Sequence, residues 1–87
     1  SKAHSAMTLY ATLYEKRLLS KDDIDGYYQN AGTLPAHTDR LTNKYIEISA
    51  GSLGHGLPIA IGMAHALKLK KSNRQVYVLM GDGESQE

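Results

Sequence analysis

The sequence has 87 residues, and its ten basic and nine acidic side chains leave a net charge of +1. This near balance gives no support to a nucleic-acid or membrane-surface partner, because both select basic patches. The absence of cysteine excludes a disulfide framework, a thiolate zinc site and a cysteine nucleophile. No apolar run approaches the roughly 18 residues of a membrane span, and no signal peptide opens the sequence, so we expect a soluble, cytoplasmic protein.

Two helices are predicted in the first third of the chain. Ser1 or Ser5 is placed to cap the first helix, whose apolar residues recur at the spacing of one helix face. We expect this helix to end near Leu18–Leu19. Ser20 is a suitable N-cap for a second helix over residues 21–29, whose first turn is acidic.

The middle of the chain is predicted to be irregular before a third helix begins. Residues 30–44 contain turn-forming and polar residues and are interpreted as loops. Tyr45–Ile48 is interpreted as a short extended segment, and residues 49–56 are rich in small side chains. The apolar run that follows predicts a deeply buried helix, with His65 as a packing residue, which should begin near Ser52–Gly56 and continue to Leu69.

The glycine-rich loop before this third helix has two interpretations. Free backbone N–H groups and the positive end of the helix dipole would make it a ready anion site. It matches neither standard phosphate-loop pattern, however, and its glycines would equally allow close packing of the helix on a sheet. The residues by themselves leave both interpretations open.

The C-terminal part of the sequence contains the clearest predicted strand. Val76–Met80 is a short apolar run with β-branched and aromatic residues, bounded by polar residues and by Gly81. A single strand cannot satisfy its own backbone, so we expect residues 1–87 to be part of a larger α/β domain. Asp82 follows the strand at the edge where parallel sheets bind ligands, and a carboxylate there suits Mg²⁺. A simple turn is the alternative.

Four separated stretches resemble motifs of the thiamine-diphosphate enzymes of the transketolase group. Ser1–Ala6 resembles S-[KN]-G-H-[AGS], and Leu34–His37 resembles L-P-G-H. Gly51–Gly56 resembles G-[SP]-L-G-Q-G, and Gly81–Glu87 resembles the G-D-G-x-x-x-E that opens the thiamine-diphosphate motif. Their order and spacing are similar to those of the family's first, diphosphate-binding domain, and the resemblance covers essentially the whole chain.

The resemblance implies a fold and several cofactor contacts. The fold would be an α/β domain with a parallel sheet that binds thiamine diphosphate, and residues 1–87 would be its partial N-terminal portion. Asp82 would coordinate the Mg²⁺ that bridges the diphosphate of the cofactor, and Gly83 would give a backbone contact to the same group. The backbone of Gly51 would receive the 4′-amino group of the cofactor, and Leu53 would pack on its rings.

Two histidines and one glutamate complete the site that the resemblance implies. His4 would lie near the diphosphate and thiazolium of the cofactor. His37 would hydrogen-bond hydroxyls of the sugar donor, a role that suits a side chain that titrates near neutrality. Glu87 matches the acidic position of the network that joins paired active sites. Three residues depart from the motifs, namely Ala3 and Ala36 in place of glycine and His55 in place of glutamine.

The implied activity is the transfer of a two-carbon ketol unit between sugar phosphates, as in the pentose phosphate pathway. The resemblance also implies that a second metal ligand and the glutamate that activates the cofactor lie outside residues 1–87. It therefore implies a homodimer or a complex with a C-terminal-half subunit. The alternatives are an enzyme resembling 1-deoxyxylulose-5-phosphate synthase and a catalytically silent interaction or regulatory domain. Leu34–His37 favours the transketolase type over the synthase.

Overall fold

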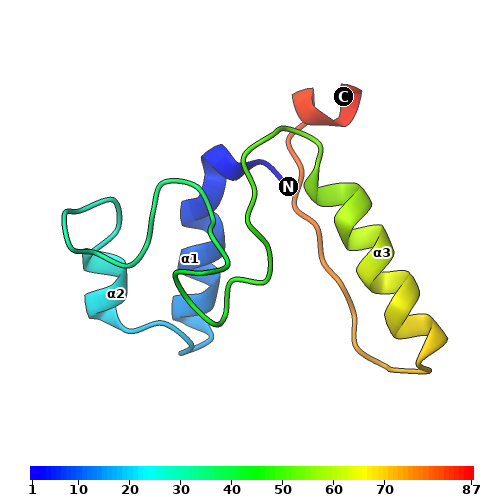
Figure 1. The fold of residues 1–87 in the computed structure, drawn as a ribbon, viewed down its shortest axis with the longest axis horizontal. Coiled ribbons are helices and arrows are strands. Elements are labelled where there is room, and N and C mark those ends of the chain that lie inside the picture. Colours follow the sequence, from blue (N-terminus) through cyan, green and yellow to red (C-terminus); the bar gives the residue numbers. More distant parts are fainter. The chain divides into compact units, whose positions relative to one another are not determined.

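The computed structural model describes residues 1–87, which form two compact units. The first unit is Ala3–Gly51, and the second unit is Ser52–Glu87 together with Ser1 and Lys2. Figure 1 shows the helices of both units. In chain order the elements are the 3₁₀ helix η1 (Ala3–Ser5), the α-helices α1 (Ala6–Glu15), α2 (Lys21–Asp25) and α3 (Gly56–Leu69), and the 3₁₀ helix η2 (Gly83–Gln86).

Helix α1 ends earlier than the sequence predicts, at Glu15 rather than near Leu18–Leu19. Arg17 adopts a left-handed φ of 60°, and the N–H of Leu18 donates to the carbonyl oxygen of Leu13 at 2.9 Å. This pattern is a Schellman motif, which satisfies the last free carbonyls and reverses the chain. Glycine is the usual residue at the left-handed position, so an arginine there carries no signal that the helix stops.

Helix α2 begins where the sequence predicts because Ser20 caps it. The Ser20 hydroxyl accepts the N–H of Asp23 at 3.1 Å, and the Asp23 carboxylate accepts the N–H of Ser20 at 2.9 Å. This reciprocal capping box satisfies two backbone donors that the helix cannot pair internally. The helix ends at Asp25 instead of near Gln29, because the chain turns at once and Tyr28 has a left-handed φ of 54°.

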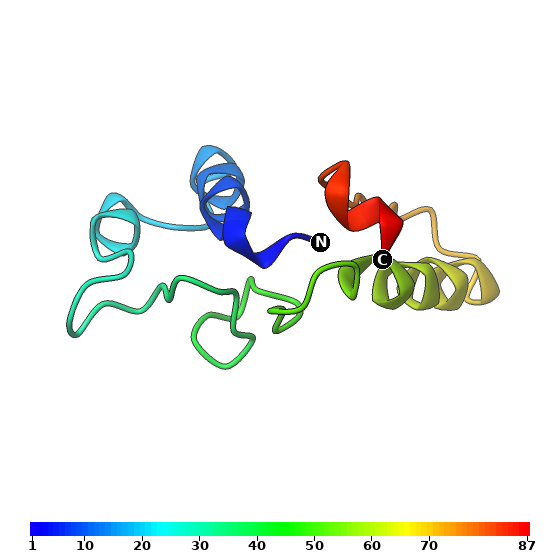
Figure 2. The ribbon, with the colours of Figure 1, turned by 90° about the horizontal axis from the view of Figure 1, so that it is seen from above.

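The core of the first unit is made by its helices together with the loops that follow them. Figure 2 shows α1 and α2 side by side, with the irregular chain running beneath them. Tyr10 lies at the centre of this core with 0% of its surface exposed, and its hydroxyl donates to the carbonyl oxygen of Pro35 at 2.8 Å. The buried residues of the core are Ala6, Tyr10, Leu19, Leu34 and Ile46.

Helix α3 begins and ends as predicted, but it is not deeply buried. Only Gly56 and Ala60 are buried among its residues, and the Ile61 side chain is 60% exposed. His65, which the sequence predicts to be a packing residue, is exposed as well. A helix is buried only by what packs against it, and within this unit only residues 72–81 run back alongside α3 (Figure 1). None of the helices has the length and apolar character that a membrane crossing requires.

No β-strand forms in residues 1–87, so the predicted parallel sheet is not confirmed. Val76–Met80 and Tyr45–Ile48 both lack the hydrogen bonds of a strand ladder. Tyr77, in the middle of the first of these segments, is 86% exposed. The apolar pattern favours an extended conformation, but a strand also needs a neighbour whose N–H and C=O groups pair with its own. Neither segment has such a neighbour in these residues.

Candidate functional site

A buried carboxylate, that of Glu84, joins three of the motif stretches in the second unit. Glu84 is 4% exposed. Its Oε1 accepts the N–H of Gly54 at 3.1 Å, and its Oε2 accepts the N–H of Gly81 at 2.9 Å. The Ser1 hydroxyl donates to the same carboxylate and accepts the N–H of Gly56 at 3.1 Å. One side chain therefore links the serine motif, the glycine-rich loop and the Gly81 turn.

The environment of Glu84 keeps its carboxylate charged. The hydrogen bond from the Ser1 hydroxyl does most to hold the pKa of Glu84 below its ordinary value of 4.5, followed by the N–H of Gly81. Burial acts in the opposite direction, because it disfavours the charged form. The carboxylate also lies beside the loop that leads into α3, where the helix dipole favours a negative charge.

The glycine-rich loop before α3 is not a free anion site. The N–H groups of Gly54 and Gly56 are bound by Glu84 and Ser1, respectively. The N–H of His55 donates to the carbonyl oxygen of Ser52 at 3.4 Å. The negative group that this loop binds is therefore the protein's own carboxylate.

Two of the glycines in this loop are required by close approach within the second unit. Gly54 has a φ of 81°, and a Cβ there would lie 3.0 Å from the Cβ of Glu87. A Cβ on Gly56 would lie 2.7 Å from the Cα of Ser1. Packing of the loop on its own unit, rather than on a sheet, explains these two glycines.

Asp82 begins η2 and leaves one carboxylate oxygen without a hydrogen bond. Its Oδ1 accepts the N–H of Gly83 at 2.8 Å, and its carbonyl oxygen accepts the Ser85 hydroxyl at 2.5 Å. The Asp82 side chain is exposed, so Oδ2 can bind a hard cation such as Mg²⁺. No group of three or more His, Cys, Asp or Glu side chains is placed to hold a metal ion. Asp82 thus fits Mg²⁺ as a single ligand.

The other predicted cofactor residues lie on accessible parts of the chain. A Cβ on Gly83 or on Gly51 would meet nothing within 4 Å, which leaves room for a ligand to approach either backbone. The N–H of Gly83 is already bound by Asp82. Leu53 is 37% exposed, and the N–H of Glu87 donates to the carbonyl oxygen of Glu84 at 3.1 Å. The cofactor contacts of these residues stay predictions.

In the first unit, the two predicted catalytic histidines come together. The rings of His4 and His37 meet edge to face, with centroids 5.4 Å apart and an interplanar angle of 66°. His4 is exposed and His37 is half-buried, so ring nitrogens of the pair are accessible to a ligand. The Tyr10 hydroxyl holds the Pro35 carbonyl, which fixes the loop that carries His37.

The alanines that replace motif glycines fit the backbone without strain. Neither Ala3 nor Ala36 has a positive φ, so the cost of placing a Cβ in the left-handed region does not arise. Ala3 is in fact buried in the unit that it shares with Ala36. The departures from the motif therefore leave the two histidines free to come together.

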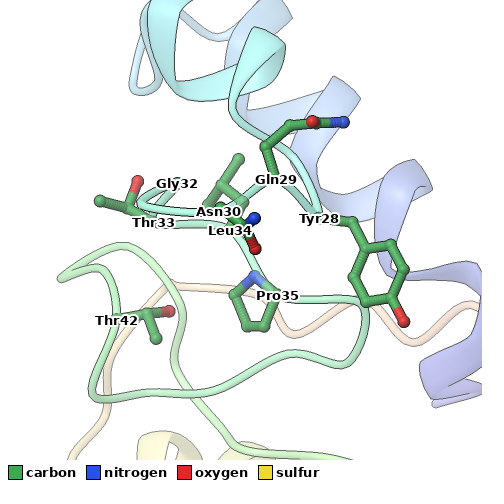
Figure 3. Close-up of a pocket in the computed structure, with 8 residues that line it drawn as sticks. All are labelled: Tyr28, Gln29, Asn30, Gly32, Thr33, Leu34, Pro35 and Thr42. Atoms are coloured by element: carbon green, nitrogen blue, oxygen red, sulfur yellow. The ribbon is translucent and has the colours of Figure 1, made fainter.

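A cavity of about 610 Å³ lies beside the loop that leads to His37, as Figure 3 shows. No charged side chain lines it, so it suits the hydroxyl groups of a neutral ligand better than a phosphate. None of the predicted site residues is among those that line it. The lining residues are Tyr28, Gln29, Asn30, Gly32, Thr33, Leu34, Pro35 and Thr42.

Glu84 is the functional candidate that the sequence interpretation missed. It occupies an unspecified position of the G-D-G-x-x-x-E pattern, where any residue is allowed. A usable signal was the glycine-rich loop itself, because its unpaired N–H groups require an acceptor when they are buried. Which acid supplies that acceptor depends on the tertiary structure.

The whole chain matches one protein family. The family described as "Transketolase, thiamine diphosphate binding domain" matches residues 1–87. The match assigns the chain to the class of thiamine-diphosphate-binding domains, in agreement with the motifs that meet at Glu84 and at the histidine pair. The chain belongs to the transketolase family, of which it represents the N-terminal, thiamine-diphosphate-binding part.

Several curated relatives carry transketolase names. One of the two apulose-4-phosphate transketolase subunits of this kind, from Actinobacillus succinogenes, is 40% identical over 84 residues, which cover 97% of this chain and 30% of the relative. The 6-deoxy-6-sulfo-D-fructose transketolase subunit SqwG of a Clostridium species is 36% identical over 87 residues, with 100% and 32% covered. Human transketolase-like protein 2 is 40% identical over 89 residues, with 100% and 14% covered. The chain thus spans less than a third of the length of these relatives.

Proposed function

We propose that this chain is the cofactor-binding part of a transketolase that transfers a two-carbon ketol unit between sugar phosphates, using thiamine diphosphate and Mg²⁺. The contact between His4 and His37 carries the proposal, because it joins two motifs that are distant in the sequence. The family of the chain supports the same class of reaction, as do the relatives that are named transketolase subunits.

Asp82 is the proposed metal ligand. Its free Oδ2 suits Mg²⁺, which prefers carboxylate and phosphate oxygens. A diphosphate is multiply charged and needs a cation to hold it, and the donors before α3 are already bound to Glu84 and Ser1. The absence of a Cβ at Gly83 would let the diphosphate approach the same turn. Gly51 and Leu53 keep their proposed contacts with the aminopyrimidine and the rings.

The two histidines are the proposed sugar-binding and proton-transferring groups. A neutral imidazole donates a hydrogen bond from one nitrogen and accepts one at the other, which suits sugar hydroxyls and a developing alkoxide. His37 would bind the hydroxyls of the donor, and His4 would lie near the diphosphate. When bound, the cofactor supplies the electron sink for the cleavage of the carbon–carbon bond. The chain's own part is to orient the sugar and to move its protons.

A partner is part of the proposal, because the chain spans less than a third of its bacterial relatives. Those relatives are named as subunits, which supports a complex with a second subunit of the C-terminal-half type; a homodimer is the other form. Glu87 would then join the network between paired sites. The parallel sheet is proposed for the complete domain, and a cytoplasmic location for the enzyme.

Calorimetry on the complete protein with its partner tests the metal site. We expect thiamine diphosphate to bind in the presence of Mg²⁺, and Asp82→Asn to weaken Mg²⁺ binding by about tenfold or more, because the amide carries no charge. Asp22→Asn, an exposed aspartate of α2, is the matched control and should bind as the wild type does. Absence of binding at millimolar cofactor, or unchanged binding in Asp82→Asn, contradicts the proposal. Conversion of one sugar phosphate into another by the wild type then separates an enzyme from a silent domain.

A further inference from the structure

We propose that Glu84 is a positioning residue for the metal site, because its carboxylate fixes the Gly81–Gly83 turn against the loop before α3. Through that turn it would set the direction of the Asp82 side chain. The inference rests on the proposed function, in which Asp82 binds Mg²⁺. It adds a residue that the family motif leaves unspecified.

The hydrogen bonds hold Asp82 from both sides. Glu84 Oε2 accepts the N–H of Gly81, the residue just before Asp82, at 2.9 Å. Glu84 itself lies in η2, the 3₁₀ helix that Asp82 begins and caps. The four residues 81–84 therefore form a closed ring, with Asp82 inside it. Rotation of the Asp82 backbone would break the bond to Gly81 or the first turn of η2.

The second oxygen of Glu84 anchors this ring to the rest of the unit. Oε1 accepts the N–H of Gly54, and the Ser1 hydroxyl links the carboxylate to the N–H of Gly56. Gly56 lies at the first turn of α3 and is in contact with Ser1. The ring is thus tied to a fourteen-residue helix, which is a rigid support. Figures 1 and 2 both place η2 beside the start of α3.

Glu84 is not placed to bind the metal directly. Both of its oxygens accept hydrogen bonds from donors of the chain, and the residue is almost fully buried. Asp82, by contrast, is exposed and keeps one oxygen free. A ligand supported by a neighbouring hydrogen-bonded group is the usual arrangement of a metal site, and loss of the supporting group typically weakens metal binding about 10- to 100-fold.

The test uses the complete protein with its partner and three variants. Glu84→Ala removes both acceptors, whereas Glu84→Gln keeps the size and one acceptor, because an amide nitrogen cannot accept the second N–H. Gln86→Ala, at an exposed residue of the same 3₁₀ helix, is the control. Calorimetry gives the Kd for Mg²⁺ at saturating thiamine diphosphate. Hydrogen exchange of the Gly54 and Gly81 amides, measured without metal or cofactor, reports the carboxylate contacts themselves.

We expect Glu84→Ala to raise the Kd for Mg²⁺ about 10- to 100-fold, Glu84→Gln to have an intermediate effect, and Gln86→Ala to have none. The turnover number at saturating Mg²⁺ should change less than that Kd. Faster exchange of the Gly54 and Gly81 amides in Glu84→Gln supports the inference even if Glu84→Ala does not fold. A wild-type Kd in folded Glu84→Gln, or unchanged amide exchange, overturns it. Wild-type protein that binds no cofactor would instead overturn the proposed function.

Discussion

The imidazole rings of His4 and His37 lie edge to face, with their centroids 5.4 Å apart. His4 is carried by η1 and His37 by a loop without regular structure, so the contact depends on the core between them. Tyr10 fixes that core, since its hydroxyl binds the Pro35 carbonyl and its ring is fully buried. The pair therefore acts as one structural group, and substitutions in it should not be independent.

A double-mutant cycle on the two histidines tests that dependence. We expect His37→Ala to lower kcat/KM for the sugar donor by about 100-fold, as loss of an acid–base group typically does. His4→Ala should then add little to it, because residues in contact are coupled by about 0.5–3 kcal/mol. Steady-state kinetics on the complete enzyme measures both. Losses that multiply in the double variant would show two independent groups.

The two serine N-caps should differ in their contribution to stability. Ser20 makes a capping box with Asp23, whereas Ser5 precedes α1 without a side-chain hydrogen bond to it. Ser20→Ala should therefore lower the free energy of unfolding by about 1 kcal/mol, and Ser5→Ala should change it little. Urea titration measures both variants. Equal losses would mean that the capping box is not the source of the effect.

Helix α3 ends on a strained residue that glycine should relieve. Lys71 has a left-handed φ of 54°, and the N–H of Ser72 donates to the carbonyl oxygen of Leu67 at 3.0 Å, as in a Schellman motif. Lys71→Gly should raise the free energy of unfolding by about 1 kcal/mol, because only glycine adopts this conformation without cost. Lys70→Gly removes the same charge at a φ of −80° and should give no gain. A gain in both variants would indicate a charge effect.

Burial of Tyr10 predicts a loss of stability at alkaline pH. Burial raises the pKa of Tyr10 above 10.0, and the nearby Tyr27 and Asp39 add to the effect. The folded state therefore keeps the proton after the unfolded state has lost it, so stability is full below about pH 10 and falls as pH rises through the higher value. Tyr10→Phe should lack this fall. Below pH 10 it should cost about 1 kcal/mol, the net value of the bond to Pro35. Thermal unfolding across this pH range compares the two proteins.

Two glycines of α3 should respond to alanine in opposite directions. A Cβ on Gly56 would lie 2.7 Å from the Cα of Ser1, so Gly56→Ala should destabilise the protein by about 1–3 kcal/mol. A Cβ on Gly62 would meet nothing within 4 Å, so Gly62→Ala should stabilise the helix by about 0.5–1 kcal/mol. The unfolding midpoint in urea measures both changes. Destabilisation by Gly62→Ala would show that another part of the complete protein packs on that face.

Part of the candidate site could be predicted from the sequence and part could not. The motif pattern was sufficient to select His4, His37 and Asp82, because motifs preserve residue type and spacing. The same pattern suggested an anion site before α3, where the structure instead has the Glu84 carboxylate. A donor-rich loop indicates that an acceptor is needed, but not which residue supplies it.

The sequence by itself determined the family, the start of α2 and the bounds of α3, because motifs and caps act over a few neighbouring residues. Only the tertiary structure decided the early end of α1, the histidine contact and the role of Glu84. Backbone reversal at Arg17 has no glycine to announce it, and the two contacts join segments far apart along the chain. The pairing of Val76–Met80 likewise depends on a neighbouring strand. Local chemistry selects what a segment can form, and its partners in space decide what it does form.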